Sequence, residues 1–149
     1  MKIDGGCHCG YIAYEAKADL GAAIICNCTD CQTLSGSAFR TVLPTREGSF
    51  KLRSGELKIY VKTGESGTAR PQSFCPNCGT PIYSTTVGKD PKVYVLRLGT
   101  VRQRDQFAPK LHFWSKLVAL TNGAQTKEIN FRVFSDGRRI DWRSAIRTE

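Results

Sequence analysis

The stretch Cys75-Pro76-Asn77-Cys78-Gly79 has the form of a metal-binding knuckle, and it decides how the rest of the sequence is interpreted. Pro76 fixes φ within the turn, Gly79 permits a positive φ after it, and the turn amides can point at the two sulfur atoms. A C-x-x-C pair can also be a redox site, but redox pairs begin a helix in a βαβ pattern. Gly79 and Pro81 disfavour such a helix, so we predict that Cys75 and Cys78 supply part of the ligand set of a zinc site.

A second pair of thiols lies near the amino terminus, in Gly5-Gly6-Cys7-His8-Cys9-Gly10. Residues i and i+2 of an extended chain point the same way, so Cys7 and Cys9 can face one metal while His8 faces the other side. The two pairs together supply the four thiolates of a tetrahedral structural Zn²⁺ site. This metal would clamp the amino-terminal strand to the middle of the chain, and we expect its loss to remove much of the folding energy.

The third motif, Cys26-Asn27-Cys28-Thr29-Asp30-Cys31, packs three thiols into six residues and leaves no cysteine for a fourth position. A catalytic zinc site keeps one position open, and such a zinc activates a bound water or an incoming thiol. Thiolate-rich zinc suits sulfur chemistry better than hydrolysis. His112 as a fourth ligand and an iron–sulfur cluster are the alternatives, although a cluster normally needs four cysteines. We predict an open three-thiolate zinc site.

A short helix is predicted within this third motif. Thr29 and Gln32 match a capping box, with Thr29 as N-cap, and the helix would run over residues 30–35 and stop at Gly36. Cys31 would then lie in its first turn, where the helix dipole favours a thiolate. A capping pattern is common, however, and by itself it is weak support for a helix.

The composition is ordinary for a soluble globular protein, with 40% hydrophobic and 23% charged residues. No apolar run approaches the ~20 residues that a membrane helix needs, and the segment before Cys7 lacks the apolar core of a signal peptide. We therefore expect a cytoplasmic protein, in which a cysteine pattern indicates metal rather than disulfides. Seven cysteines, an odd number, also fit a disulfide framework poorly.

The chain is basic, with a formal net charge of +9 that assumes neutral thiols. Subtracting seven thiolate charges and adding two Zn²⁺ ions leaves +6, which favours anionic partners but weakens the indication of nucleic-acid binding.

The remaining segments predict a mainly β fold, because alternating apolar and polar residues are bounded by turn signals. We expect residues 50–53 and 57–61 to form a hairpin around Ser54-Gly55, and residues 63–71 to form a loop. No repeat, low-complexity segment or linker is evident, so we expect one domain over residues 1–149. The other expected strands are residues 11–18, 38–43, 82–85, 93–98, 111–114 and 128–134.

The three cysteine motifs resemble those of the glutathione-dependent formaldehyde-activating (Gfa-like) family. The resemblance covers about residues 3–115 and is carried by G-x-C-H-C-G, by C-x-C-x-x-C followed by Ser35-Gly36-Ser37-Ala38-Phe39, and by F-C-P-x-C-G-x-P-I-Y. It implies a β-tent of antiparallel sheets with zinc knuckles and one or two short helices. It also implies a structural zinc on Cys7, Cys9, Cys75 and Cys78, and a catalytic zinc on Cys26, Cys28 and Cys31.

The activity that the resemblance implies is that of a carbon–sulfur lyase, which reversibly joins glutathione and formaldehyde as S-hydroxymethylglutathione. We therefore expect small thiol and aldehyde substrates, with two Zn²⁺ per chain and glutathione as co-substrate. Glutathione is net anionic, which a basic surface favours. The candidate contacts are Arg40, Arg70, His112 and Trp114.

Two other functions remain open at this point. One is a non-catalytic zinc protein that binds glutathione or another small thiol. The other is nucleic-acid binding through zinc ribbons and the basic tail over residues 138–149. Aromatic residues are not interleaved with that tail and no recognition helix is evident, so we expect neither a nucleic-acid nor a membrane partner.

Overall fold

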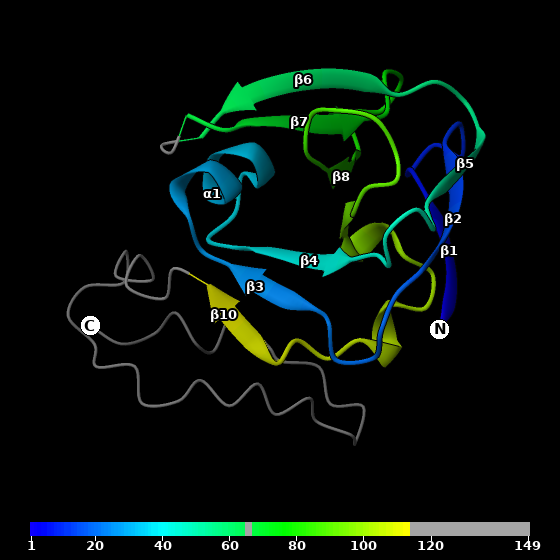
Figure 1. The fold of residues 1–149 in the computed structure, drawn as a ribbon, viewed down its shortest axis with the longest axis horizontal. Helices are drawn as coiled ribbons and strands as arrows, with labels where there is room; N and C mark the ends of the chain where they lie inside the picture. The colour runs from blue at the N-terminus through cyan, green and yellow to red at the C-terminus, as the bar shows by residue number, and fades with distance from the viewer. Residues whose placement is uncertain (65–66, 114–149) are drawn as a thin grey trace, which may run out of the picture.

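The computed structural model describes residues 1–64 and 67–113, and the fold is given for these residues (Figure 1). They form two β-sheets, one α-helix and two short 3₁₀ helices, which confirms the mainly β fold. No helix in this part of the chain is long and apolar enough to cross a membrane. The strand expected over residues 128–134 and the basic tail lie outside the described residues.

The small sheet has the strand order β1-β2-β5, and both of its strand pairs are antiparallel. Its strands are β1 (Lys2–Gly6), β2 (Ala13–Lys17) and β5 (Lys51–Ser54). Burial alternates along β1 and β2, so that Ile3, Tyr14 and Ala16 face inward while their sequence neighbours are more exposed. This alternation is typical of a sheet that covers a core with one face.

The large sheet has the order β10-β3-β4-β9-β8-β7-β6. Its pairs are antiparallel except that of β10 with β3, which is parallel. Its strands are β3 (Ile24–Cys26), β4 (Arg40–Pro44), β6 (Lys58–Thr63), β7 (Ala69–Phe74), β8 (Pro81–Ser84), β9 (Val95–Arg97) and β10 (Leu111–Phe113). Helix α1 (Thr29–Ser35) joins β3 to β4, and the 3₁₀ helices are Leu98–Thr100 and Arg104–Gln106.

The core lies where the two sheets meet. The small sheet contributes Tyr14, which is 1% exposed, and the large sheet contributes Leu43 and Ile82, which are fully buried. Backbone bridges between Gly5 and Val101 and between Ala18 and Thr45 tie the small sheet to the rest of the chain. In Figure 1 the small sheet stands at one end of the large one.

The expected hairpin between residues 50–53 and 57–61 is wrong, because the two strands enter different sheets. Strand β5 pairs with β2, whereas β6 pairs with β7. The chain turns away at Gly55, which has φ +74° and where an added Cβ would lie 2.6 Å from the carbonyl oxygen of Tyr11. Only glycine fits this conformation and this close approach, and the turn therefore separates the two sheets.

The expected loop over residues 63–71 is also shorter than predicted. Strand β7 already begins at Ala69, and it pairs with β6 from Thr63↔Ala69 to Lys58↔Phe74. Pro71 lies opposite Val61 within this ladder. The local sequence Ala69-Arg70-Pro71-Gln72 has little strand character, so tertiary pairing overrides propensity here.

Candidate functional site

Four cysteines meet between the tips of two hairpins that belong to different sheets. Cys7 and Cys9 lie on the turn that joins β1 to β2, and Cys75 and Cys78 lie on the turn that joins β7 to β8. Their four sulfur atoms all lie within 4.8 Å of one another. The expectation that the Cys7–Cys9 segment is extended is wrong, because it is a turn in which the Gly10 amide donates to the Cys7 carbonyl at 3.2 Å.

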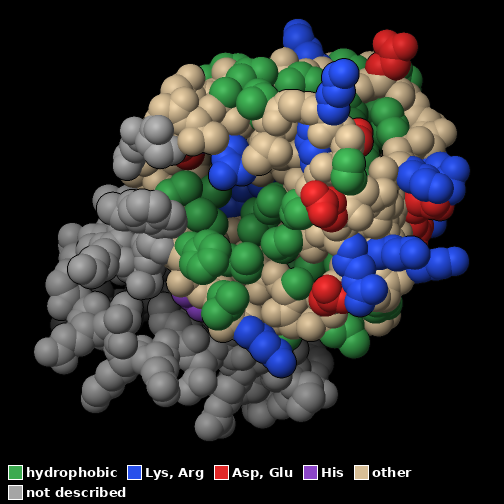
Figure 2. Space-filling model, in the orientation of Figure 1, with side chains coloured by type: hydrophobic (Ala, Val, Ile, Leu, Met, Phe, Trp, Pro, Cys, Tyr) green, Lys and Arg blue, Asp and Glu red, His purple; other side chains and the backbone are tan. Residues whose placement is uncertain are grey.

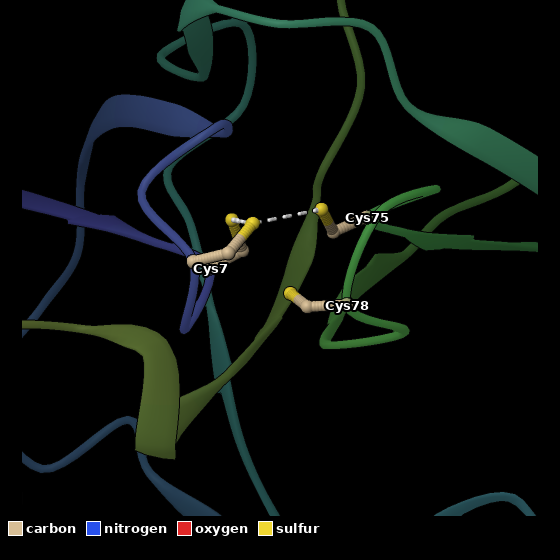
Figure 3. Close-up of side chains that lie close together, drawn as sticks. Cys7, Cys75 and Cys78 are labelled. Atoms are coloured by element: carbon tan, nitrogen blue, oxygen red, sulfur yellow. Dashed lines mark hydrogen bonds between the residues drawn. The ribbon is translucent and has the colours of Figure 1, made fainter.

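The spacing of these sulfurs, the four-cysteine cluster, fits a tetrahedral metal site. Four ligands about 2.3 Å from a zinc ion lie about 3.8 Å apart, and the sulfur–sulfur distances are 3.5 Å for Cys7 and Cys9 and 3.8 Å for Cys9 and Cys75. Figure 3 shows the labelled side chains of Cys7, Cys75 and Cys78 converging between the two turns. The cluster can therefore hold a metal ion with its side chains as they stand.

Hydrogen bonds within the two turns favour the thiolate form of two of these cysteines, Cys7 and Cys78. The Ile12 amide donates to the Cys7 sulfur at 3.2 Å. Thr80 lies with its hydroxyl 3.1 Å from the Cys78 sulfur, and this contact lowers the pKa of Cys78 to about 5. Gly79 has the positive φ that the knuckle motif predicts, at +70°, and its amide donates to the Cys75 carbonyl at 2.9 Å.

The other three cysteines, the cysteine triad, sit where β3 passes into α1. Cys26 is the last residue of β3, and Cys28 is the N-cap of α1, with its sulfur accepting from the Cys31 amide at 3.4 Å. The predicted N-cap, Thr29, is therefore wrong by one residue: a cysteine sulfur takes the place of the expected hydroxyl. The helix end at Gly36 is confirmed.

The three sulfurs of the triad lie within 4.8 Å of one another, and those of Cys26 and Cys28 are 3.5 Å apart. A hydrogen bond from the Cys31 thiol, above all, lowers the pKa of Cys26 to about 5, and the same contact raises the pKa of Cys31. Within the described residues no histidine or carboxylate joins the triad. The triad can hold a metal through three ligands.

Asn27 fixes the backbone between the first two cysteines of the triad. It is 4% exposed, and both its amide nitrogen and its side-chain Nδ2 donate to the Phe113 carbonyl at 3.1 Å. This contact anchors the triad to β10, which lies parallel to β3 with Phe113 opposite Cys26. The sequence analysis missed Asn27, because its partner lies 86 residues further along the chain.

A pocket of about 500 Å³ opens beside the triad. One face of the large sheet forms its floor, because the register places Cys26 opposite Arg40, Val42 opposite Arg97, and Gln72 opposite Ser84. Opposed residues of antiparallel strands point to the same face. In Figure 2, Lys and Arg side chains are recessed in the region where Figure 1 shows α1 below the β6–β7 hairpin.

The pocket carries more positive than negative charge among the described residues. Its lining cations are Arg40, Lys62, Arg70 and Arg97, and its lining acid, Asp30 on α1, forms an ion pair with Lys62 on β6. This pair joins the helix to the edge hairpin across the pocket. The excess of cations favours anionic ligands next to the thiols.

Two of these cations, Arg40 and Arg97, are deeply buried, at 6% and 7% exposure. Burial lowers the pKa of both guanidinium groups, that of Arg97 to about 10, so both remain charged at neutral pH. The Nη2 of Arg97 donates to Oε1 of Gln72 at 2.6 Å. The Nη2 of Arg40 and the Nε of Arg97 are buried without a hydrogen-bond partner in residues 1–64 and 67–113.

The pocket includes half of the contacts proposed from the sequence. Arg40 and Arg70 line it, whereas His112 is exposed on β10 and lies outside the lining, and Trp114 falls outside the described residues. Lys62, Gln72 and Arg97 were missed. Their approach to the triad depends on long-range strand register, which no local pattern contains.

The family model of the glutathione-dependent formaldehyde-activating enzymes matches residues 2–117. The chain belongs to this family. Membership in this family explains why the three cysteine motifs occur in this order. The matched residues include both cysteine clusters and all the residues that line the pocket.

A crystal structure of a Rhodobacter sphaeroides protein has a similar fold, with a TM-score of 0.55 at 21% sequence identity. The similarity covers 73% of this chain and 98% of that chain. At this identity it supports the fold of this family member and carries no statement about substrate.

Proposed function

We propose that the protein is a zinc-dependent carbon–sulfur lyase of the S-hydroxymethylglutathione synthase type. A carbon–sulfur bond forms between the glutathione sulfur and the formaldehyde carbon, and the thiol proton ends on the aldehyde oxygen. Membership in the family supports this reaction. The observation that carries the proposal is a three-thiol cluster, with no fourth ligand among the described residues, in the wall of a cationic pocket.

In this proposal Cys26, Cys28 and Cys31 hold the catalytic Zn²⁺. Zinc in such a site supplies Lewis-acid activation of a thiol. The chain itself holds the three sulfurs in place: Cys28 caps α1, the first helical turn favours negative charge, and Asn27 fixes the intervening backbone. The sulfurs are therefore positioned by secondary structure rather than by a free loop.

The four-cysteine cluster holds the second Zn²⁺ in this proposal, as a structural ion. Its ligands come from the two sheets and lie away from the residues that line the cationic pocket. Of two Zn²⁺ per chain, one would then stabilise the fold and the other would take part in the reaction.

The pocket would bind glutathione through charge. Glutathione carries two carboxylates and one ammonium group, and the excess of lining cations attracts a net anion into the pocket. Both clusters also need reduced thiols, and all seven cysteines of the chain are free. We therefore propose that the protein works in the cytoplasm on small thiol and aldehyde substrates.

Exchange spectroscopy with ¹³C-formaldehyde and glutathione tests the proposal, because it measures the rate of adduct formation at equilibrium. We expect the zinc-loaded chain to raise this rate well above the uncatalysed background, and Cys28→Ser to abolish the increase. Glutathione binding without any increase would instead favour a non-catalytic zinc protein that binds small thiols.

A further inference from the structure

We propose that Arg40 and Arg97, the arginine pair, form a carboxylate-binding site in the pocket beside the cysteine triad. The substrate class of the pocket is then a thiol that carries a carboxylate, and neutral thiols are poor ligands. This inference deepens the proposed function and rests on it, because it assumes that the substrate thiol reaches the triad.

The arginine pair is buried beyond nine-tenths, yet it keeps unused hydrogen-bond donors. Among the described residues Arg40 Nη2 and Arg97 Nε have no partner, although both residues line the pocket. A buried donor without a partner loses its hydration and gains nothing in return, so native structures rarely keep one unless a ligand or ion completes it. Two such donors in one pocket indicate a missing acceptor.

The register of the large sheet places the arginine pair on one face beside the triad. Arg40 lies opposite Cys26 across β3 and β4, and Arg97 lies opposite Val42 on the other side of β4. Arg40 and Arg97 are therefore diagonal neighbours whose side chains share a face. A group bound between them lies in the same pocket as the sulfur atoms.

The remaining contacts of Arg97 fix the position of its side chain but leave one of its hydrogen-bond donors unused. Gln72 Oε1 accepts from Arg97 Nη2 at 2.6 Å, and Gln72 in turn donates to the Arg70 carbonyl at 3.4 Å. Gln72 is uncharged, so the positive charge of Arg97 is not neutralised by it. A planar guanidinium with free donors matches a carboxylate, which can accept two parallel hydrogen bonds.

A second role for the arginine pair is to balance the negative charge of the triad. Such a role needs the charge of the guanidinium groups but not their free donors, and it predicts no preference among incoming thiols. The two roles therefore differ in a measurable way, which is the selectivity of the pocket.

The test is calorimetric titration of the zinc-loaded full chain with two matched thiols, 3-mercaptopropionate and its neutral amide. The titrations are made at about 0.15 M salt, which screens the general surface charge. A charge-assisted hydrogen bond predicts at least about tenfold tighter binding of the carboxylate. We also expect propionate, which lacks a thiol, to compete with 3-mercaptopropionate.

Two variants test whether the preference for the carboxylate-bearing thiol comes from the arginine pair. Arg97→Gln should reduce the preference to about twofold or less, whereas Arg53→Gln, which removes an exposed charge on β5 in the small sheet, should retain it. Circular dichroism checks that both variants fold. If Arg97→Gln does not fold, the two thiols and propionate still decide the question on the unmodified chain.

Equal affinity for the two thiols would overturn this inference and leave the proposed lyase activity standing. Retention of the full preference in a folded Arg97→Gln variant would overturn it as well. Failure of both thiols to bind would overturn the proposed function, and the inference with it.

Discussion

Cys9 and Cys75 bring their sulfur atoms to 3.8 Å although 66 residues separate them in the chain. Cys9 belongs to the hairpin tip of the small sheet and Cys75 to a hairpin tip of the large sheet. A metal ion bound here joins the two sheets at a point where the protein has no disulfide. We therefore propose that the four-cysteine cluster stabilises the fold, whereas the triad serves chemistry.

Cys78→Ser and Cys28→Ser should affect stability very differently. Cys78→Ser breaks the four-cysteine cluster, and we expect it to lower the free energy of unfolding by more than about 3 kcal/mol or to prevent folding. Cys28→Ser leaves that cluster intact, and a serine hydroxyl can still cap α1. Thermal unfolding of the two zinc-loaded variants measures the difference, and equal destabilisation would make the triad structural.

Metal analysis of the reduced chain should find about two zinc ions per chain, because two separate sulfur clusters fit metal ligation. Cys28→Ser should lower the value to about one. Mass spectrometry under native conditions, with reductant present throughout, counts the ions directly. A value near one for the unmodified chain would contradict the catalytic zinc site.

Gly55→Ala should destabilise the protein by about 2–4 kcal/mol, because the new Cβ meets the Tyr11 carbonyl and φ is +74°. Gly67→Ala is the matched control. Its φ is +76°, but an added Cβ meets nothing within 4 Å in the described part of the chain, so we expect a loss of only about 1 kcal/mol. Urea unfolding of the two variants compares them, and similar losses would show that the contact with Tyr11 is unimportant.

Stability should fall above pH 10 through Tyr14. Burial raises the pKa of Tyr14 to about 12 from 10.0, so the unfolded chain releases the phenol proton first. The stability contribution is fully present below pH 10 and is lost as the pH rises toward 12. At about pH 11 the loss is roughly 1.4 kcal/mol.

Tyr14→Phe is the control for this pH dependence. It removes the 2.7 Å hydrogen bond to Thr100, which lowers stability equally at every pH, but it also removes the ionisable group. The difference between the two proteins in urea unfolding should therefore shrink between about pH 9 and pH 11. A constant difference would mean that Tyr14 does not titrate in this range.

Much of the clustering of the cysteines could be predicted from the sequence because their turns are encoded locally. The spacing of Cys75 and Cys78 with Gly79 requires a tight turn, and Gly36 ends the helix where expected. The pairing of strands is not local. Alternation in residues 50–61 predicts two strands but does not say that β5 joins β2 and β6 joins β7.

The pocket was harder to predict than the cysteine clusters for the same reason. Arg40 follows the triad closely and was proposed as a contact, but Arg97 reaches it only through the β4–β9 pair. Gln72 directly follows the expected loop over residues 63–71, where Pro71 and the polar residues near it have low strand propensity. Predicting the pocket requires both the positions of the charged residues and the register of the strands that bring them together.

The β6–β7 hairpin, which ends the large sheet in the described chain, supplies Lys62, Arg70 and Gln72 to the pocket. It shares no strand pair with β3 or α1, which carry the triad. Apart from the ion pair of Lys62 with Asp30 on α1, its side chains can therefore change without altering the strand pairs that hold the triad. If the proposed function holds, the hairpin side chains that face a substrate can change while the cysteines that hold the metal stay the same.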